Sequence, residues 1–274
     1  MRRWWPWGST RGATADGRSR GAAAADATIR RTVAARLAAW QHLDDDERDR
    51  LVSLTAEIVQ TMRWESARGF ELTDEMVLTI SAHAALPVLE LGADLYRSVS
   101  TIIVHPRTIV LTGTRPGPVA GTVSDEPDFL LGEAHFRGPV LLAWAAVLRQ
   151  AQRPQRGEDV VIHEFAHRLD MLDGLVDGTP PLDDDARARW VEVCTAEFEQ
   201  LRDGEPDPLL RRYAASDPGE FFAVASEAFF TRPVEMDESK PALYGVLRDF
   251  YRQDPAARER RSAVTAADGP PPTP

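Results

Sequence analysis

The most informative segment of the chain is residues 160–170, Val-Val-Ile-His-Glu-Phe-Ala-His-Arg-Leu-Asp. Its apolar residues predict a helix buried among other elements. Each residue of a helix turns by about 100°, so His163 and His167 project from the same face. That spacing allows two neutral imidazoles to bind one tetrahedral zinc ion, with Glu164 beside them as a general base toward water. We therefore interpret this segment as the zinc-binding helix of a metallopeptidase.

The alternative is that His163 and His167 are ordinary core histidines beside an unrelated glutamate. The apolar surroundings disfavour it, because burying unpaired imidazoles and a carboxylate is costly. The longer pattern H-E-x-x-H-x-x-G-x-x-H is absent, since Asp170 and Asp173 occupy that region. This excludes the metzincin class of metallopeptidases.

Composition excludes several other classes of protein. The 274 residues carry a formal net charge of -11, which argues against a nucleic-acid backbone or an anionic membrane as the main partner. The single cysteine, Cys194, excludes an intramolecular disulfide and a cysteine-rich zinc site. No run approaches the roughly 18 apolar residues of a membrane span, and residues 8–20 lack the apolar segment of a signal peptide. We expect a cytoplasmic monomer.

The chain divides by composition into a domain and two tails. Residues 1–26 are rich in Gly, Ala, Arg and Ser and predict a disordered tail. Residues 27–253 are expected to form a single peptidase domain, with a helical part at 27–97 and the catalytic part at 98–253. The Pro-rich end, residues 254–274, predicts a flexible tail.

Helical patterns dominate the first part of this domain. Residues 27–62 carry two apolar stripes, and Asp44–Glu47 between them is a good helix start with acids in the first turn. A third helix is predicted from Thr73 to Leu91. It carries His83, a candidate metal ligand, although a lone histidine on a helix more often has a structural role.

The strands are predicted from β-branched runs. Residues 99–105 and 108–111 lie on either side of Pro106-Arg107 and predict a hairpin or a bent strand pair, and 112–128 read as a loop. Residues 138–144 predict a further strand, whose Pro139 suggests a strand start or a sheet edge. An edge strand here could hold an extended peptide by strand addition, and an ordinary core strand is an equal alternative.

A catalytic zinc site needs a third protein ligand. The segment 213–230 offers Glu220 and Glu227 on a helix that starts with Asp217 as N-cap and a proline at N1. The two glutamates are about 10 Å apart along the helix axis, so both cannot readily bind one zinc. Glu220 could instead complete a capping box, and Glu227 could orient a ligand or be solvated. The residues alone leave this choice open.

Four segments, residues 138–144, 161–171, 177–181 and 213–227, together resemble the Mlc titration factor A family of zinc peptidases. These glucose-regulated metallopeptidases have a catalytic fold similar to that of anthrax lethal factor. The resemblance covers roughly residues 40–250. It implies an α+β, zincin-like domain of the lethal-factor type, helix-rich with a small mixed sheet.

The resemblance also implies the roles of the site residues. One Zn²⁺ per chain would be held by His163, His167 and Glu220, with Glu164 as the general base and Tyr213 supporting the oxyanion. Asp170, on the same helix face as His163, is a candidate acceptor for an imidazole N–H, and a capping or surface role is an equal alternative.

The function that the resemblance implies is zinc-dependent hydrolysis of a peptide or protein substrate. Members of the family resemble aminopeptidases in some respects, but the residues here do not distinguish exo- from endo-cleavage. The family name comes from binding a sugar-responsive repressor. The alternative function is therefore a regulator that binds a transcriptional repressor, with weak or incidental peptidase activity. Neither direct nucleic-acid binding nor membrane association is expected.

Overall fold

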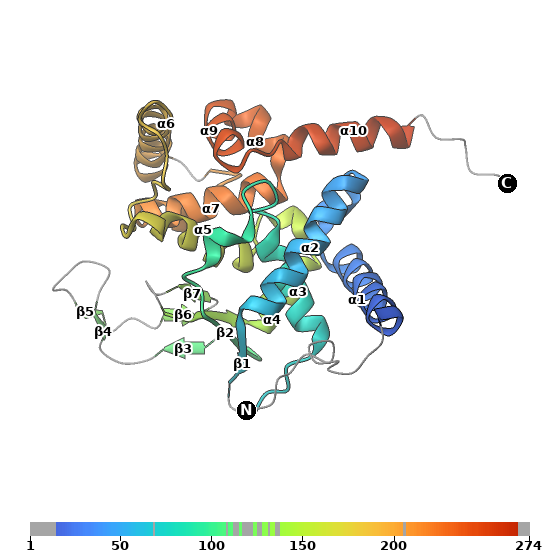
Figure 1. Cartoon of the computed structure of the whole chain (residues 1–274). Coiled ribbons are helices and arrows are strands. Elements are labelled where there is room, and N and C mark those ends of the chain that lie inside the picture. The colour runs from blue at the N-terminus through green and yellow to red at the C-terminus, as the bar shows by residue number, and fades with distance from the viewer. Residues whose placement is uncertain are drawn as a thin grey trace.

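The computed structural model describes residues 15–67, 69–107, 138–204 and 207–267, together with five short strands between 109 and 134. The described residues form an α+β domain in which helices far outnumber strands (Figure 1). This confirms the predicted fold class. In these residues no helix is long and apolar enough to span a membrane.

The helices of the N-terminal part begin where local capping chemistry places them. They are α1 (Ala15–Arg36), the 3-10 turn η1 (Ala38–His42), α2 (Asp45–Thr61) and α3 (Asp74–Ala85). Asp44 and Glu47 form a complete capping box at the start of α2, and Thr73 caps α3, so both predicted starts are confirmed. Helix α3 ends six residues earlier than predicted, because Pro87 cannot continue it.

The main sheet has four strands in the order β1-β2-β8-β7. Their bounds are Arg63–Ser66 for β1, Thr101–His105 for β2, Val140–Ala143 for β8 and Gly132–Ala134 for β7. Strand β2 pairs in parallel with β1 and β8, whereas β7 pairs with β8 antiparallel. The sheet is therefore small and mixed, as predicted.

One prediction about the strands is wrong. The hairpin expected around Pro106 does not form, because β2 pairs with β1 and β8 while β3 (Ile109–Leu111) pairs with β6 (Asp128–Leu130). The strand Val140–Ala143 has a neighbour on each side, so of the two alternatives left open the core strand is the one that forms. The expected loop at 112–128 contains the short pair β4 (Arg115–Pro116) and β5 (Val123–Ser124).

The C-terminal part of the chain is helical, with two buried helices at its centre. Its helices are α4 (Trp144–Ala151), η3 (Pro154–Arg156), α5 (Val160–Asp170), η4 (Met171–Asp173), α6 (Asp184–Asp203), η5 (Arg212–Ala215), α7 (Pro218–Thr231), α8 (Pro233–Ser239), α9 (Pro241–Tyr251) and α10 (Pro255–Ala267). The last four each start with proline, which is preorganised for the first helical position. Helices α5 and α7 lie side by side in the middle of the domain (Figure 1).

Both tails are shorter than predicted. Residues 1–14 lie outside the described residues, but α1 already begins at Ala15, within the expected disordered tail. At the other end, α10 is helical to Ala267, and its buried Arg258 forms an ion pair with Glu47 at 2.6 Å. The expected flexible tail at 254–274 is therefore corrected as far as residue 267. The division of 27–253 at residue 97 stays a prediction.

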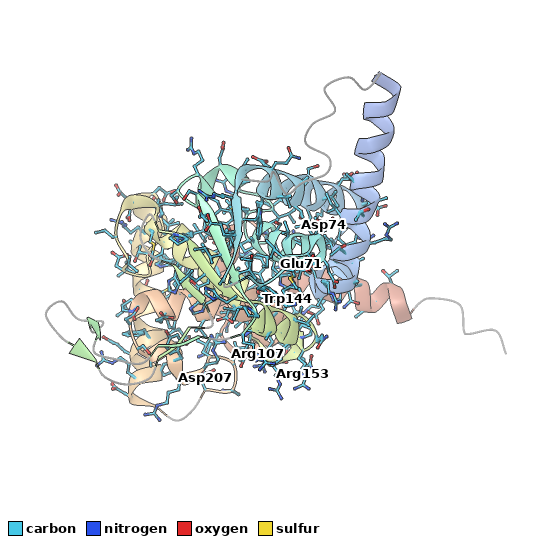
Figure 2. All side chains as sticks on the ribbon, turned by 90° about the horizontal axis from the view of Figure 1, so that it is seen from below. Glu71, Asp74, Arg107, Trp144, Arg153 and Asp207 are labelled. Atoms are coloured by element: carbon cyan, nitrogen blue, oxygen red, sulfur yellow. The ribbon has the colours of Figure 1, made fainter. Side chains whose placement is uncertain are left out.

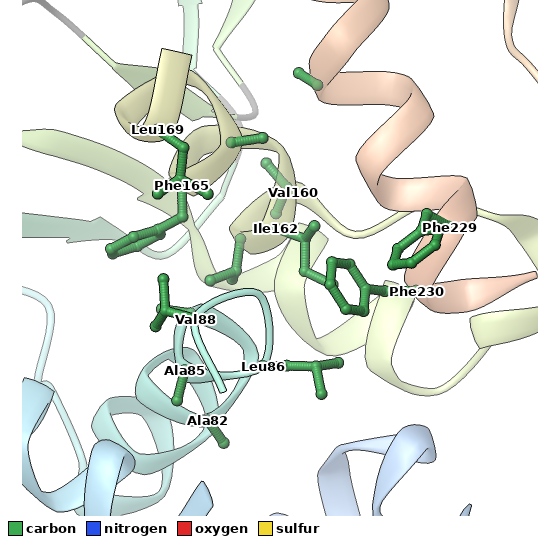
Figure 3. Packing of buried hydrophobic residues seen from close by; sticks show 14 of the residues in the cluster. Ala82, Ala85, Leu86, Val88, Val160, Ile162, Phe165, Leu169, Phe229 and Phe230 are labelled. Carbon is green, nitrogen blue, oxygen red and sulfur yellow. The ribbon is translucent and has the colours of Figure 1, made fainter. Parts of the chain in front are cut away.

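Many charged side chains lie on the surface of the protein, although several near α5 are buried. Figure 2 shows the molecule from below and labels the exposed Glu71 and Asp74, just before and at the start of α3, and the exposed Arg153, which follows α4. Apolar side chains pack around α5 as well. Phe165, Ile162 and Leu169 of α5 face residues of the α3 end and of α7 (Figure 3). All eleven residues of α5 are buried, so its histidines project from a rigid support.

Candidate metal centre

Helix α5 is fixed at both of its ends. Asp159 is its N-cap, and its side chain accepts hydrogen bonds from the N–H groups of Val161 and Ile162, each at 3.1 Å. Toward the C-terminal end, the buried Arg168 donates to the carbonyls of Gly138 and Pro139, at 3.0 and 3.2 Å. These bonds tie α5 to the chain leading into β8, so the helix face between them has a defined orientation.

His163, His167 and Glu220 meet in one cluster, and the ligand atoms that they offer lie within 4.8 Å of one another. The two imidazole Nε2 atoms are 3.2 Å apart. The Glu220 carboxylate lies 3.1 Å from Nε2 of His163 and 3.6 Å from Nε2 of His167. Ligands at about 2.0–2.2 Å on one tetrahedral zinc are separated by about 3.3 Å. The three distances therefore fit a tetrahedral metal ion.

Glu220 reaches the histidines because of its place in the first turn of α7. Its N–H donates to Asp217 at 3.0 Å, but its carboxylate points to the imidazoles rather than back to the N-cap. One carboxylate oxygen, Oε2, is buried and forms no hydrogen bond of acceptable geometry within the described chain, although Nε2 of His163 lies near it. A buried oxygen in this position fits a bound cation.

Glu227 does not join the three donors but holds one of them. Its Oε1 accepts a hydrogen bond from Nδ1 of His163 at 2.8 Å, which leaves the other ring nitrogen, Nε2, facing the cluster. The same buried carboxylate accepts from the N–H of Asp159 at 2.6 Å and pairs with Arg211 at 2.6 Å. The structure thus separates the two glutamates whose roles the sequence left open.

The acidic residues around the cluster shift its proton equilibria. Burial lowers the pKa of His163, but the neighbouring carboxylates of Glu220 and Glu227 outweigh this and raise it to about 10. Burial raises the pKa of Glu220, but His163 and His167 together hold it well below its usual range. The cluster without metal is therefore an ion-paired one, in which a proton on His163 must leave before a cation binds.

Two further residues predicted for the site lie beside the cluster. Glu164 is buried on α5, and its negative charge adds to the rise in the pKa of His163. Tyr213 comes from η5, immediately before α7, and its ring centroid lies 6.3 Å from that of His163. Its side chain is 53% exposed, so a substrate entering the site could touch it.

The structure also decides between the alternatives for Asp170 and His83. Asp170 accepts from the N–H of Gly178 at 3.0 Å, and within the described residues its Oδ1 has no hydrogen-bond partner. In the described residues no hydrogen bond joins it to an imidazole, and Nδ1 of His163 bonds to Glu227 instead. His83 lies outside the cluster and contacts Asp159 through Nδ1 at 2.5 Å, which supports its structural interpretation.

Sequence reasoning missed Asp159 and Arg211. Asp159 immediately precedes the apolar run of α5, a signature of an N-cap that could have revealed its capping role. Its further contact with Glu227, 68 residues away, has no local signal. Arg211 stands two residues before Tyr213, and no pattern in its segment indicates that it pairs with a buried carboxylate.

Comparison with known proteins defines the class to which this site belongs. The model of the family described as glucose-regulated metallo-peptidase M90 matches residues 14–252. Two relatives are named Mlc titration factor A. The one from Serratia proteamaculans is 34% identical over 85% of this chain and 94% of its own. The one from Edwardsiella ictaluri is 34% identical over 81% and 86% of the two chains.

A third relative, an uncharacterized protein of Synechocystis, is 33% identical over 80% of this chain and 82% of its own. The site and these matches together define a protein of a metallopeptidase class. The chain belongs to the family of glucose-regulated metallo-peptidases M90.

Proposed function

We propose that this protein is a zinc-dependent peptidase that holds one Zn²⁺ per chain on His163, His167 and Glu220. The observation that carries the proposal is the convergence of three donor atoms within 4.8 Å, from two buried helices. Two nitrogens and one carboxylate oxygen are a donor set typical of catalytic zinc. When bound, zinc would supply the Lewis acidity that polarises a peptide carbonyl.

The remaining chemistry belongs to side chains. The carboxylate of Glu164 would accept a proton from the attacking water and then deliver that proton to the leaving amine. Its burial supports this role, because a carboxylate in a low-dielectric site interacts strongly with nearby charge. The Tyr213 hydroxyl would donate a hydrogen bond to the developing oxyanion. Its exposure next to His163 leaves it accessible to a peptide or protein substrate.

The test combines metal analysis with digestion of a peptide library. Glu164→Gln is expected to keep one zinc per chain and to lose cleavage, because it removes the base and none of the ligands. Glu220→Ala is expected to lose zinc and cleavage together. If Glu220→Ala keeps its full zinc content while Glu227→Ala loses it, the assignment of the third ligand is wrong. The same library, read for cleavage position, separates exo- from endopeptidase activity.

A second candidate function is binding of a transcriptional repressor, with peptidase activity incidental to it. The names of the Serratia and Edwardsiella relatives favour this candidate. Glu164→Gln separates the two functions in cells. A cellular phenotype that survives this substitution supports binding, and one that is lost supports catalysis. For either function we place the protein in the cytoplasm as a monomer, to be checked by fractionation and by light scattering.

A further inference from the structure

A cavity of about 220 Å³ lies behind the first turn of α5, apart from the metal cluster. None of His163, His167 and Glu220 lines it. Its walls come from η1, α4, η3, α10 and the ends of α3 and α7. Leu86, Ile162 and Phe230 form its apolar floor, and Figure 3 shows these three side chains close together between α3, α5 and α7.

The two arginines of the cavity wall and His83 already have partners. Arg258 donates to Glu47 at 2.8 Å and to Gln253 at 2.9 Å. Arg36 pairs with Glu75, and none of these acceptors lines the cavity. His83 contacts Asp159 through Nδ1, and its Nε2 donates to the carbonyl of Arg36 at 3.1 Å. The cations of the wall are thus neutralised by the protein itself.

Two carboxylates of the wall have no such partner. Glu158 and Glu259 both line the cavity, are half-buried, and form no ion pair with any residue in the described part of the chain. The sole hydrogen bond of Glu158 there is a long one of 3.4 Å from Gln150. The charge that the cavity leaves uncompensated is therefore negative. An apolar floor below unpaired carboxylates is complementary to a cation with an apolar body.

We propose that this cavity is a binding site for a small organic cation, an ammonium group carried on a compact apolar body. The ammonium would be held between Glu158 and Glu259, and the apolar body would pack on Leu86, Ile162 and Phe230. The volume is below the roughly 300–1,000 Å³ of sites for drug-sized ligands, so the ligand has the size of a single ring with a short arm.

The position of the cavity gives such a ligand a direct contact with the support of the metal centre. Asp159, in the wall, caps α5, and its N–H donates to Glu227, the carboxylate that holds His163. Binding itself does not depend on the proposed peptidase activity, so the site can be tested without bound metal. This separates a failure of the present inference from a failure of the proposed function.

The test uses benzylammonium as the probe, with benzyl alcohol and benzoate as neutral and anionic controls of the same shape. The full chain is freed of metal by a chelator, because an amine could otherwise coordinate zinc. Calorimetry gives the affinity, and methyl NMR locates the probe through Ile162, with the buried Ile102 of β2 as a reference outside the cavity. We expect benzylammonium to bind at least about tenfold more tightly than either control and to shift the Ile162 methyl signals.

Charge-removing variants then assign the site. Glu158→Gln and Glu259→Gln should each weaken binding of benzylammonium about tenfold, whereas Glu192→Gln, an exposed change on α6, should leave it unchanged. Glu220→Ala should also leave it unchanged, because the metal cluster is separate. Equal affinity for benzoate, insensitivity to both cavity variants, or loss of binding in Glu220→Ala would each overturn the proposal. The two glutamates are half-buried without ion pairs, so the variants should fold, as their thermal unfolding will show.

Discussion

Glu227 accepts a hydrogen bond from Nδ1 of His163 at 2.8 Å, and the carboxylate is almost completely buried. One group thereby fixes the orientation and the tautomer of a proposed ligand. Glu227→Ala should lower the affinity for zinc about 10–100-fold while leaving the three donor residues in place. Competition with a chromophoric chelator measures the affinity. An unchanged affinity in a folded variant would contradict the role of Glu227, and Glu192→Gln on the surface of α6 serves as the control.

Arg211 is the cationic partner of that carboxylate, at 2.6 Å. Arg211→Ala leaves a buried charge with only hydrogen bonds to support it, which is destabilising. About a third of the Arg211 side chain is exposed, so solvent reduces the effect, and we expect a loss of about 1–3 kcal/mol in the free energy of unfolding. Urea denaturation measures this loss. The neighbouring exposed Arg212 provides a matched control, and Arg212→Ala should change stability by no more than about 0.5 kcal/mol.

Asp170 gives a pH dependence to the stability. Burial raises the pKa of its carboxyl from 3.8 to about 6, against the opposing hydrogen bond from Gly178. The folded state therefore holds this proton more tightly than the unfolded state, and stability falls as the pH rises from about 4 to about 6. Asp170→Asn removes the titrating carboxyl and therefore this loss of stability. The asparagine keeps an oxygen that can accept a hydrogen bond from the N–H of Gly178.

The stability of Asp170→Asn relative to the parent chain should therefore increase across this pH range, by up to about 3 kcal/mol. Denaturation at several pH values, with chelator present so that metal does not contribute, gives the difference. A constant difference between pH 4 and pH 7 would show that Asp170 titrates normally. The sign of this change with pH follows from the raised pKa of Asp170 alone. It does not depend on the pH-independent effect that the substitution has on stability.

Gly178 packs against the start of α7. A Cβ atom there would lie 2.2 Å from the carbonyl oxygen of Pro218, and the φ of +73° already disfavours a side chain. Gly69 has the same φ but nothing within 4 Å, so it isolates the backbone effect. We expect Gly69→Ala to cost about 1 kcal/mol and Gly178→Ala to cost at least about 2 kcal/mol more, measured by thermal or urea unfolding. Similar costs would contradict the close approach.

Local chemistry accounts for the features that could be predicted from the sequence. The N-cap residues are Asp44, Thr73 and Asp217. Each side chain accepts a hydrogen bond from the backbone N–H three residues later, so each helix start can be predicted from its own segment. The i and i+4 spacing of His163 and His167 likewise depends only on helix geometry. These features need no knowledge of distant contacts.

The features that escaped prediction depend on distant contacts. Strand β2 pairs with β8, almost forty residues later along the chain, rather than with β3, the strand that directly follows it, and alternation within the strand does not encode that partner. The roles of Glu220 and Glu227 are set by which imidazole nitrogen each one meets across the α5–α7 contact. The start of helix α10 can be predicted from its proline. The ion pair of its Arg258 cannot, because the partner, Glu47, lies 211 residues away.

The ion pair between Arg258 and Glu47 joins the last described helix to the beginning of α2. Pro255 and Glu259 of the same helix form part of the cavity wall behind α5. A chain shortened to residue 254 would therefore lose more than a C-terminal extension. It would leave Glu47 without its cationic partner, remove part of the cavity wall, and expose that side of Asp159, the N-cap of α5, to solvent. The last described helix, α10, is therefore a poor place to shorten the chain or to attach a fusion partner.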